Sequence, residues 1–577
     1  MKISFQHITI FLLISCFSFS QKKDENIGTE VINVVKPYTP TISDAFKIKE
    51  VPPLEDEVTT QKETIKYTIF SFPVASTFTP NKGVAAKVDK SPQEKIFDNY
   101  ATFGAGNYGN INAELFVTQS LENDDYIGAT FKHLSSQGGL KNVDLSNKFY
   151  DTSLEATYGY KTKPLSWNMN LGYQNQVYNW YGLDNSLAIP VILDKINPQQ
   201  NYNTIAIGGN LSLGESALKN ASISFSRFWD AFSSGENRFV AKPKFEFDIL
   251  NEKVTTDFSF DYINGSFKND YFANPITKYG YTNVGLSPSF NITKDDLSLN
   301  LGANFVYSVA NEGGKNKFFI YPNVTASYKI VGDLMIGFTG AEGGLIQNSY
   351  HDFVQNNFFV SPTLTIIPTD KKFDIYAGLR GKLASSVGYS VKVSYVNEDY
   401  KPFFKNNSYD ATNLNQEGYS FSNSFDIVYD TVKTLSLSGE LKADFSKNVA
   451  FAIDATFNNY SLKNEKEAWN LPTLQINSSI DFKISPKWST GFKVFFVGER
   501  KDQFINTSLV NPISDVTLSS YFDLNANILY KHTDQLSFFL KGNNLANQNY
   551  QRWLNFPVQG IQIFLGANFK FDFKKRY

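Results

Sequence analysis

The chain has 577 residues, enough for several soluble domains or for one large barrel. Its formal net charge is −2, from 54 basic and 56 acidic residues, so no basic surface indicates nucleic acid as a partner. One cysteine and four histidines exclude a disulfide framework, a cysteine-based zinc site and an iron–sulfur site.

Residues 1–20 are predicted to be an export signal peptide. Lys2 supplies a positive charge, and residues 8–19 form an apolar run that is too short to span a bilayer as a helix. Small residues favour cleavage after Ser20. A second interpretation is that the run before Cys16 is a lipobox, which predicts cleavage before Cys16 and a lipid on its sulfur.

The next segment, residues 21–95, is rich in proline and carries no glycine-rich globular pattern. Proline fixes its own backbone and disfavours helix in the residue before it, so the segment is predicted to be extended, in the periplasm or in a barrel lumen. One strand is expected within it, at residues 65–72.

Residues 96–577 follow a period of two. Apolar side chains at 297, 299, 301, 303, 305 and 307 alternate with polar or small ones, and the same pattern recurs at 435–445, 522–530 and 561–573. Alternate side chains of a strand point to opposite faces, so each run has one apolar and one polar face. Many runs are ten to thirteen residues long, close to the length that a tilted strand needs to cross a bilayer.

The connections between these runs are of two kinds. Short polar turns are predicted at 161–164, 293–296, 368–370 and 485–487, and long loops at about 135–147, 180–200, 264–280, 346–357, 398–418, 459–470 and 500–515. Short turns on one side and long loops on the other are typical of outer-membrane barrels, and in lipid a sheet must close to satisfy its backbone. The predicted fold is therefore all-β: a transmembrane antiparallel β-barrel of about 22 strands, within a range of 20–24.

The sequence leaves two points open. The alternation of turns and loops breaks down between about 384 and 449. The alternative fold is a large soluble all-β protein, such as a propeller or tandem sandwiches, but these have shorter strands and more even turns.

The C-terminal stretch carries a family resemblance. Residues 542–550 read GNNLANQNY and are followed by Trp553, by FPVQG at 556–560, and by the last alternating strand. This resembles the last hairpin of TonB-dependent receptors. Residues 376–381 of this chain in turn resemble strands from the middle of those barrels. The resemblance implies that an aromatic-ended last strand is read by the barrel-assembly machinery, a role that would fall to Phe569, Phe571, Phe573 and Tyr577.

Such receptors carry a plug domain of well over a hundred residues before the barrel, whereas residues 21–95 offer 75. The chain is therefore expected to resemble a receptor without its plug. Within the segment, one stretch looks like a TonB box, the peptide that pairs with an energy-transducing partner by strand addition: Thr29, Glu30, Val31, Ile32, Asn33, Val34 and Val35. The alternative is a strand that docks on the periplasmic rim of the barrel.

A lumen of this size needs filling. The segment 21–95, inward-folded loops or a separate protein could each fill it, and the sequence leaves the three open. Charges at positions such as Arg380, Glu440 and Asp454 are expected to line the lumen. Aromatic clusters next to long loops are predicted to form the interfacial girdle, with stacking on a sugar or a hydrophobic nutrient as the alternative: Tyr178, Trp180 and Tyr181, and Tyr395, Tyr400, Phe403 and Phe404.

The function predicted from these features is transport across the outer membrane of a Gram-negative cell. The alternatives are an accessory barrel of a secretion or assembly complex and a passive porin-like channel. His133, His351 and His532 have no metal-ligand spacing, and no serine stands in a nucleophile setting, so no enzyme, metal site or cofactor is predicted. The expected partners are the lipid bilayer, the barrel-assembly machinery, and a TonB-type protein or another complex subunit.

Overall fold

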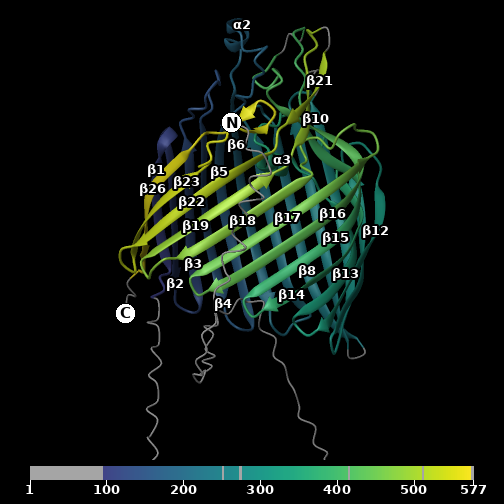
Figure 1. Cartoon of the computed structure of the whole chain (residues 1–577). Helices are drawn as coiled ribbons and strands as arrows, with labels where there is room; N and C mark the ends of the chain where they lie inside the picture. Colours follow the sequence, from purple (N-terminus) through teal and green to yellow (C-terminus); the bar gives the residue numbers. More distant parts are fainter. Residues whose placement is uncertain (1–94, 250–251, 272–275, 413–415, 510–511, 574–577) are drawn as a thin grey trace, which may run out of the picture. The chain divides into compact units, whose positions relative to one another are not determined.

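The computed structural model describes residues 95–249, 252–271, 276–412, 416–509 and 512–573 (Figure 1). The predicted signal peptide, the TonB-box-like peptide and Tyr577 lie outside these residues. No helix within the described part of the chain is long and apolar enough to cross a membrane.

One antiparallel sheet of 22 strands closes on itself, and small hairpins and helices lie in its connections. The elements are β1 (Asn99–Gly106), η2 (Asn107–Gly109), β2 (Asn110–Ser120), β3 (Asp125–Ser136), β4 (Phe149–Lys161), β5 (Leu165–Asn179), α2 (Pro190–Leu193), β6 (Gln199–Leu213), β7 (Leu218–Asp230), β8 (Gly235–Ile249), β9 (Glu252–Phe267), β10 (Thr277–Lys294), β11 (Leu297–Ala310), β12 (Lys317–Val331), β13 (Met335–Ile346), α3 (Tyr350–Asn356), β14 (Thr369–Ala384), β15 (Val387–Asn406), β16 (Phe425–Ser446), β17 (Val449–Leu462), β18 (Leu474–Lys483), β19 (Trp488–Val497), β20 (Arg500–Ile505), β21 (Ile513–Leu518), β22 (Tyr521–Lys531), β23 (Leu536–Asn543), β24 (Gln551–Trp553), β25 (Phe556–Pro557) and β26 (Gln562–Phe571).

The first and last strands close the barrel. β1 pairs with β26 in antiparallel register, from Asn99 opposite Phe571 to Gly106 opposite Phe564. At this seam the buried ring of Phe539 lies over two facing glycines, and an added Cβ at Gly566 would lie 2.2 Å from that ring. The absence of side chains at the seam therefore lets an aromatic ring cover the backbone of both edge strands.

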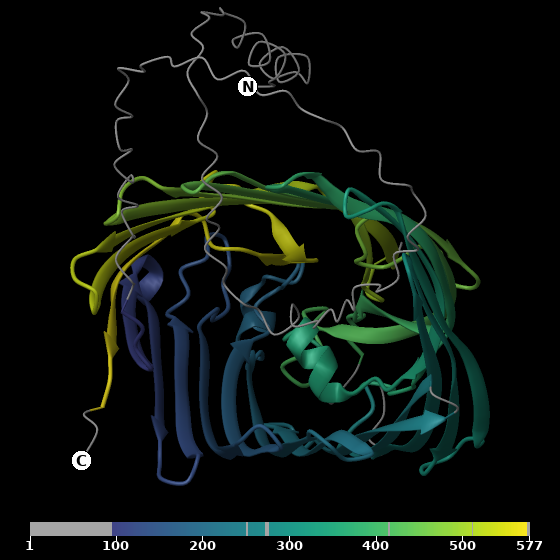
Figure 2. The ribbon, with the colours of Figure 1, turned by 90° about the horizontal axis from the view of Figure 1, so that it is seen from below.

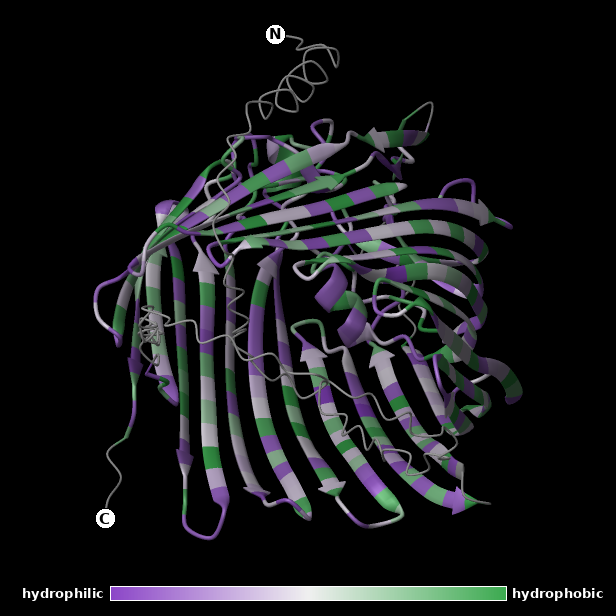
Figure 3. Ribbon diagram, turned by 60° about the horizontal axis from the view of Figure 1, so that its bottom comes forward, coloured by the Kyte–Doolittle hydropathy of each residue, from purple (hydrophilic) through white to green (hydrophobic). Residues whose placement is uncertain are grey.

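The alternation of the sequence becomes two faces of the barrel wall, visible as bands of opposite hydropathy along the strands in Figure 3. On β5, Leu171 is 56% exposed and faces outward, whereas Gln176 is 1% exposed and faces the lumen. The outer face carries exposed apolar side chains on strand after strand, including Leu154, Ile207, Ile223, Val393, Leu437 and Leu565. Such a surface is stable against lipid, so the predicted transmembrane barrel, its all-β class and its 22 strands are confirmed.

Short turns join the strands at one end of the barrel, and the longer connections lie at the other (Figure 1). The predicted turn at 368–370 is wrong. Thr369 begins β14 at the long-loop end, and the preceding connection occupies all of 347–368. The apolar residues of that connection resemble a strand in sequence, but they face a core inside the barrel, not lipid.

The expected break in the alternation of turns and loops between 384 and 449 is wrong, because the short turns 385–386 and 447–448 flank the long connection 407–424. A separate irregularity, in the side-chain pattern, lies on β15. Glu398 pairs with Val432, whereas Lys401 pairs with Asp430, so β15 carries one extra residue. Tyr400 lies in this bulge with a φ of +56°. A bulge reverses which side chains face inward, so a pattern of period two loses its phase there.

Candidate functional site: the luminal cap

The lumen is crossed by the protein's own loops. The connection 347–368, which contains α3, folds into the ring of strands, as the view along the barrel shows (Figure 2). The β24–β25 hairpin also projects inward, and the two segments pack together through a ring stack of Phe359 on Phe556 at 3.9 Å. We call the segment 347–368 and the β24–β25 hairpin the luminal cap. Of the three ways to fill the lumen, inward-folded loops are thus observed.

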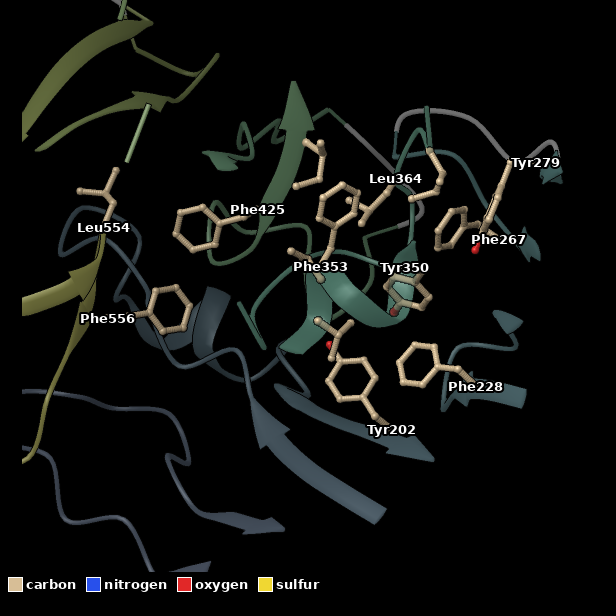
Figure 4. Packing of buried hydrophobic residues seen from close by; sticks show 14 of the residues in the cluster. Tyr202, Phe228, Phe267, Tyr279, Tyr350, Phe353, Leu364, Phe425, Leu554 and Phe556 are labelled. Atoms are coloured by element: carbon tan, nitrogen blue, oxygen red, sulfur yellow. The ribbon is translucent and has the colours of Figure 1, made fainter. Parts of the chain in front are cut away.

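An aromatic core joins the cap to the wall. Tyr350 and Phe353 of α3 are buried against luminal side chains of β6 to β10, among them Tyr202, Phe228 and Phe267 (Figure 4). The hydroxyl of Tyr202 donates to the carbonyl of Phe358 at 2.9 Å. Burial of this apolar surface inside an otherwise polar lumen stabilises the cap in its inward position.

The N-terminus of α3 is held by a carboxylate from the wall. Ser349 caps the helix by accepting from Asp352 N at 2.9 Å. Glu236 of β8, which is 2% exposed, accepts from the backbone N–H of Tyr350 at 2.7 Å and from that of His351 at 3.3 Å. A negative charge satisfies these free N–H groups and complements the positive end of the helix.

A second contact is an ion-pair bridge. Arg238 binds both carboxylate oxygens of Asp261, at 3.1 and 2.8 Å, and its remaining nitrogen donates to Asp352 of α3 at 3.0 Å. Burial alone raises the pKa of Asp352, but hydrogen bonds from His351 and Ser349 and the charge of Arg238 outweigh it and hold the pKa below its ordinary value. Asp352 is thus charged when it faces Arg238.

The cap is also bound through its backbone. The N–H of Ser361 donates to the carbonyl of Phe425 at 2.9 Å, and the N–H of Phe425 donates to the carbonyl of Phe359 at 3.0 Å. Tyr350 Oη donates to the buried Asp230 at 2.8 Å. The cap is therefore held by a set of specific polar contacts together with its apolar core.

The β20–β21 hairpin packs against the cap. Its Arg500 donates to the carbonyl of Gln551 at 2.7 Å and to that of Arg552 in the cap. Asp502, which is fully buried, accepts from Asn406 N at 3.1 Å and from Asn470 Nδ2 at 2.8 Å. Burial raises the pKa of Asp502 to about 6, and these hydrogen bonds and the charge of Lys405 limit the rise.

The aromatic clusters are only in part where the sequence predicted them. Trp180 and Phe403 are 1% exposed, and Tyr178 stacks on Phe358 of the cap at 3.8 Å, so these rings are buried within the protein and the girdle assignment is wrong for them. Tyr395 and Tyr400 are exposed on the outside, as a girdle requires. Trp180 packs against Phe232 and Tyr419 of other connections, and Phe403 packs against Trp469, contacts that the pattern of aromatic residues alone does not reveal.

The other predicted residues lie apart from the cap. Phe569 stacks on Phe571 at 5.8 Å on the outer face of β26, and Phe573 follows them. Within the described residues no group of three or more His, Cys, Asp or Glu side chains could hold a metal ion. Sequence reasoning missed Glu236 and Arg238, whose partners on α3 are 114 residues away.

The closed barrel has the fold of known outer-membrane receptors. It is similar to the FrpB iron transporter from Neisseria meningitidis, with 11% identity, a TM-score of 0.64 and coverage of 83% of this chain and 82% of that one. It is also similar to the siderophore receptor PirA from Acinetobacter baumannii, with 12% identity, a TM-score of 0.62 and coverage of 82% and 80%. The ferripyoverdine receptor from Pseudomonas aeruginosa is similar as well, with 14% identity, a TM-score of 0.59 and coverage of 84% of this chain and 72% of that one.

No protein-family model matches the sequence, and no curated protein matches it. The predicted resemblance to TonB-dependent receptors is confirmed for the fold, because the similar solved structures include receptors of the outer membrane. The apolar outer surface and the receptor-type barrel define an outer-membrane β-barrel protein, as predicted.

We expect Arg238→Ala to loosen the cap. The change leaves the carboxylate of Asp261 without its cation and removes the contact with Asp352. The free energy of local opening of α3 should therefore fall by about 1–2 kcal/mol, after allowance for partial exposure. Backbone amides of α3 should then exchange hydrogen roughly tenfold faster. Arg380→Ala is the matched control, because Arg380 lies over the ring of Phe338, away from the cap. Unchanged exchange in α3 would contradict the bridge.

The raised pKa of Asp502 predicts a pH dependence. Between its ordinary value of 3.8 and about 6, the unfolded chain has lost the proton that the folded hairpin still holds. The stability of the hairpin should therefore fall as the pH rises through this window, by about 3 kcal/mol in full. Hydrogen exchange at Gln503, corrected for its intrinsic rate, measures this. Asp502→Asn should flatten the profile, and Asp534→Asn, at the far turn, should leave it unchanged.

Proposed function

We propose that the protein transports a solute across the outer membrane through a lumen that the luminal cap closes at rest. The cap is the observation that carries this proposal. It places a buried core, an ion pair and several hydrogen bonds across a 22-stranded barrel, where a continuously open channel would have a water-filled lumen.

The similar structures support a transport role. FrpB is named an iron transporter and PirA a siderophore receptor, and neither is named as an enzyme. Identities of 11–12% leave the solute open. We therefore carry over to this chain the class of function, transport without catalysis, and not the cargo.

Movement of the cap is the physical step that the proposal requires. Its polar contacts are groups that water can satisfy when they separate, so their net cost of opening is small compared with breaking strands of the wall. The cap connects to the barrel through the ends of β13 and β14 and of β23 and β26. The wall itself can therefore stay closed while the cap moves.

Two sets of residues outside the cap belong to the same proposal. The segment Thr29–Val35 would pair with a TonB-type partner by strand addition, which supplies the energy for cap movement. The aromatic face of Phe569, Phe571, Phe573 and Tyr577 would serve as the signal that the barrel-assembly machinery reads.

The second candidate is an accessory barrel of an outer-membrane secretion or assembly complex. The observation that favours it is the same cap, because a scaffold needs no open lumen. The 75-residue segment 21–95, which is rich in proline, would then be a docking arm for another subunit.

Conductance in planar bilayers separates these roles. The wild-type protein should show no steady conductance, because the cap crosses its lumen. A variant with residues 350–366 replaced by a flexible linker should show large steps. If the replacement prevents barrel assembly, the double variant Glu236→Ala, Arg238→Ala is measured in its place. This double variant should show intermittent opening. Equal steady conductance in all three would indicate a passive channel, and silence in all three would favour the scaffold.

The partner assignment has its own test. The full chain in detergent micelles should bind the periplasmic domain of a TonB-type protein, and deletion of residues 29–35 should abolish that binding. Replacement of the neighbouring residues 22–28 by alanine and serine is the control, and it should leave the binding intact. Undiminished capture after the deletion would refute the assignment of Thr29–Val35.

A further inference from the structure

A cavity of about 610 Å³ lies at the long-loop end, between the β20–β21 hairpin and the turn before β24. We call it the outer pocket. Its volume falls within the range of sites for small ligands. The pocket is lined by Asp184, Phe504, Ser514, Val516, Thr517, Leu518, Ser519, Ser520, Tyr521, Gln548, Asn549, Tyr550, Gln551, Leu554 and Asn555.

The lining is polar but almost uncharged. Eight of its side chains are hydroxyls or amides other than tyrosine, and Asp184 is its one charged residue among the described part of the chain. The carboxylate of Asp184 is already occupied by the hydroxyl of Ser186 at 2.6 Å. The side chains of Ser514 and Asn549 make no hydrogen bond within the described residues, so they are free to bond to a ligand.

One wall of the pocket is a rigid aromatic platform. The rings of Tyr521 and Tyr550 stack with centroids 3.8 Å apart and planes 5° from parallel. Tyr550 Oη donates to Asp523 at 2.8 Å, and the guanidinium of Arg500 lies 5.5 Å from the centre of the Tyr521 ring. These contacts fix the rings before any ligand arrives, which lowers the entropic cost of binding.

The floor of the pocket belongs to the core of the cap. Phe504, Leu518 and Leu554 line the cavity and are also members of the buried cluster that contains α3. Leu554 lies in the turn between β24 and β25, within the cap itself. A ligand in the outer pocket would therefore touch the element whose movement opens the lumen.

We propose that the outer pocket binds a neutral, hydroxyl-rich ligand, an oligosaccharide, and that this is the solute whose transport is proposed above. Sugar rings present apolar C–H faces that pack on aromatic rings, and hydroxyl groups that pair with amides and serines. A charged cargo such as a ferric siderophore or a phosphate ester would need lysine or arginine in the lining to offset its desolvation.

An array of neutral and acidic oligosaccharides, probed with the full chain in detergent micelles, tests the proposal. Neutral oligosaccharides should bind and acidic ones should not. Tyr550→Ala should weaken the binding about tenfold or more, since stacking partners typically contribute on this scale. Asn549→Ala should weaken it by a smaller factor. Tyr328→Ala is the matched control, because Tyr328 is an exposed tyrosine near the short-turn end of β12.

Tyr550→Phe separates binding from folding. It keeps the stack on Tyr521 and removes only the bond to Asp523, so it should retain most of the affinity even if Tyr550→Ala proves unstable. Binding of charged probes alone, or neutral binding that Tyr550→Ala leaves intact, would overturn the proposal, as would the absence of binding to every probe. The conductance experiment is independent, so a gated lumen with an empty pocket would refute the ligand class and not the transport function.

Discussion

The constraint on which this structure depends is the hydrogen bonding of the backbone in lipid. A strand that faces hydrocarbon has no water to bind its N–H and C=O groups, so each edge must find a partner. The pairing of β1 with β26 removes the last free edge, and Phe539 covers the glycines at that seam. Once the edges are joined, 22 strands fix the width of the barrel, and that width creates the lumen that the loops must fill.

The cap crosses the lumen with an apolar core and a set of polar attachments. Its core is aromatic and its attachments are charged, with Glu236 at the start of α3 and Arg238 between two carboxylates. The apolar core stabilises the cap, whereas the polar contacts fix the position of α3 on the wall and can be replaced by bonds to water. The outer pocket shares Leu554 with this core, so a ligand bound there, as we propose, would contact the packed unit that holds the cap in place.

The residues that matter most to this arrangement are inconspicuous in the sequence. Glu236 and Arg238 stand at luminal positions of β8, where polar residues are the rule, and nothing nearby distinguishes them. Trp180 and Phe403 carry the signature of an interfacial girdle but are buried under the long connections. Their environment follows from the path of the loops, because an aromatic side chain is equally stable at a lipid boundary and in a buried core.

The sequence alone determined the class of protein, a strand number within 20–24 and most turn positions, because a strand in lipid must repeat every two residues over a length set by the bilayer. Only the tertiary structure decided what occupies the lumen. The contacts of α3 join residues more than a hundred positions apart, and the stretch at 358–367 is apolar whether it faces lipid or a core. Local periodicity reports which face of a strand is apolar, but the closure of the barrel decides what that face meets.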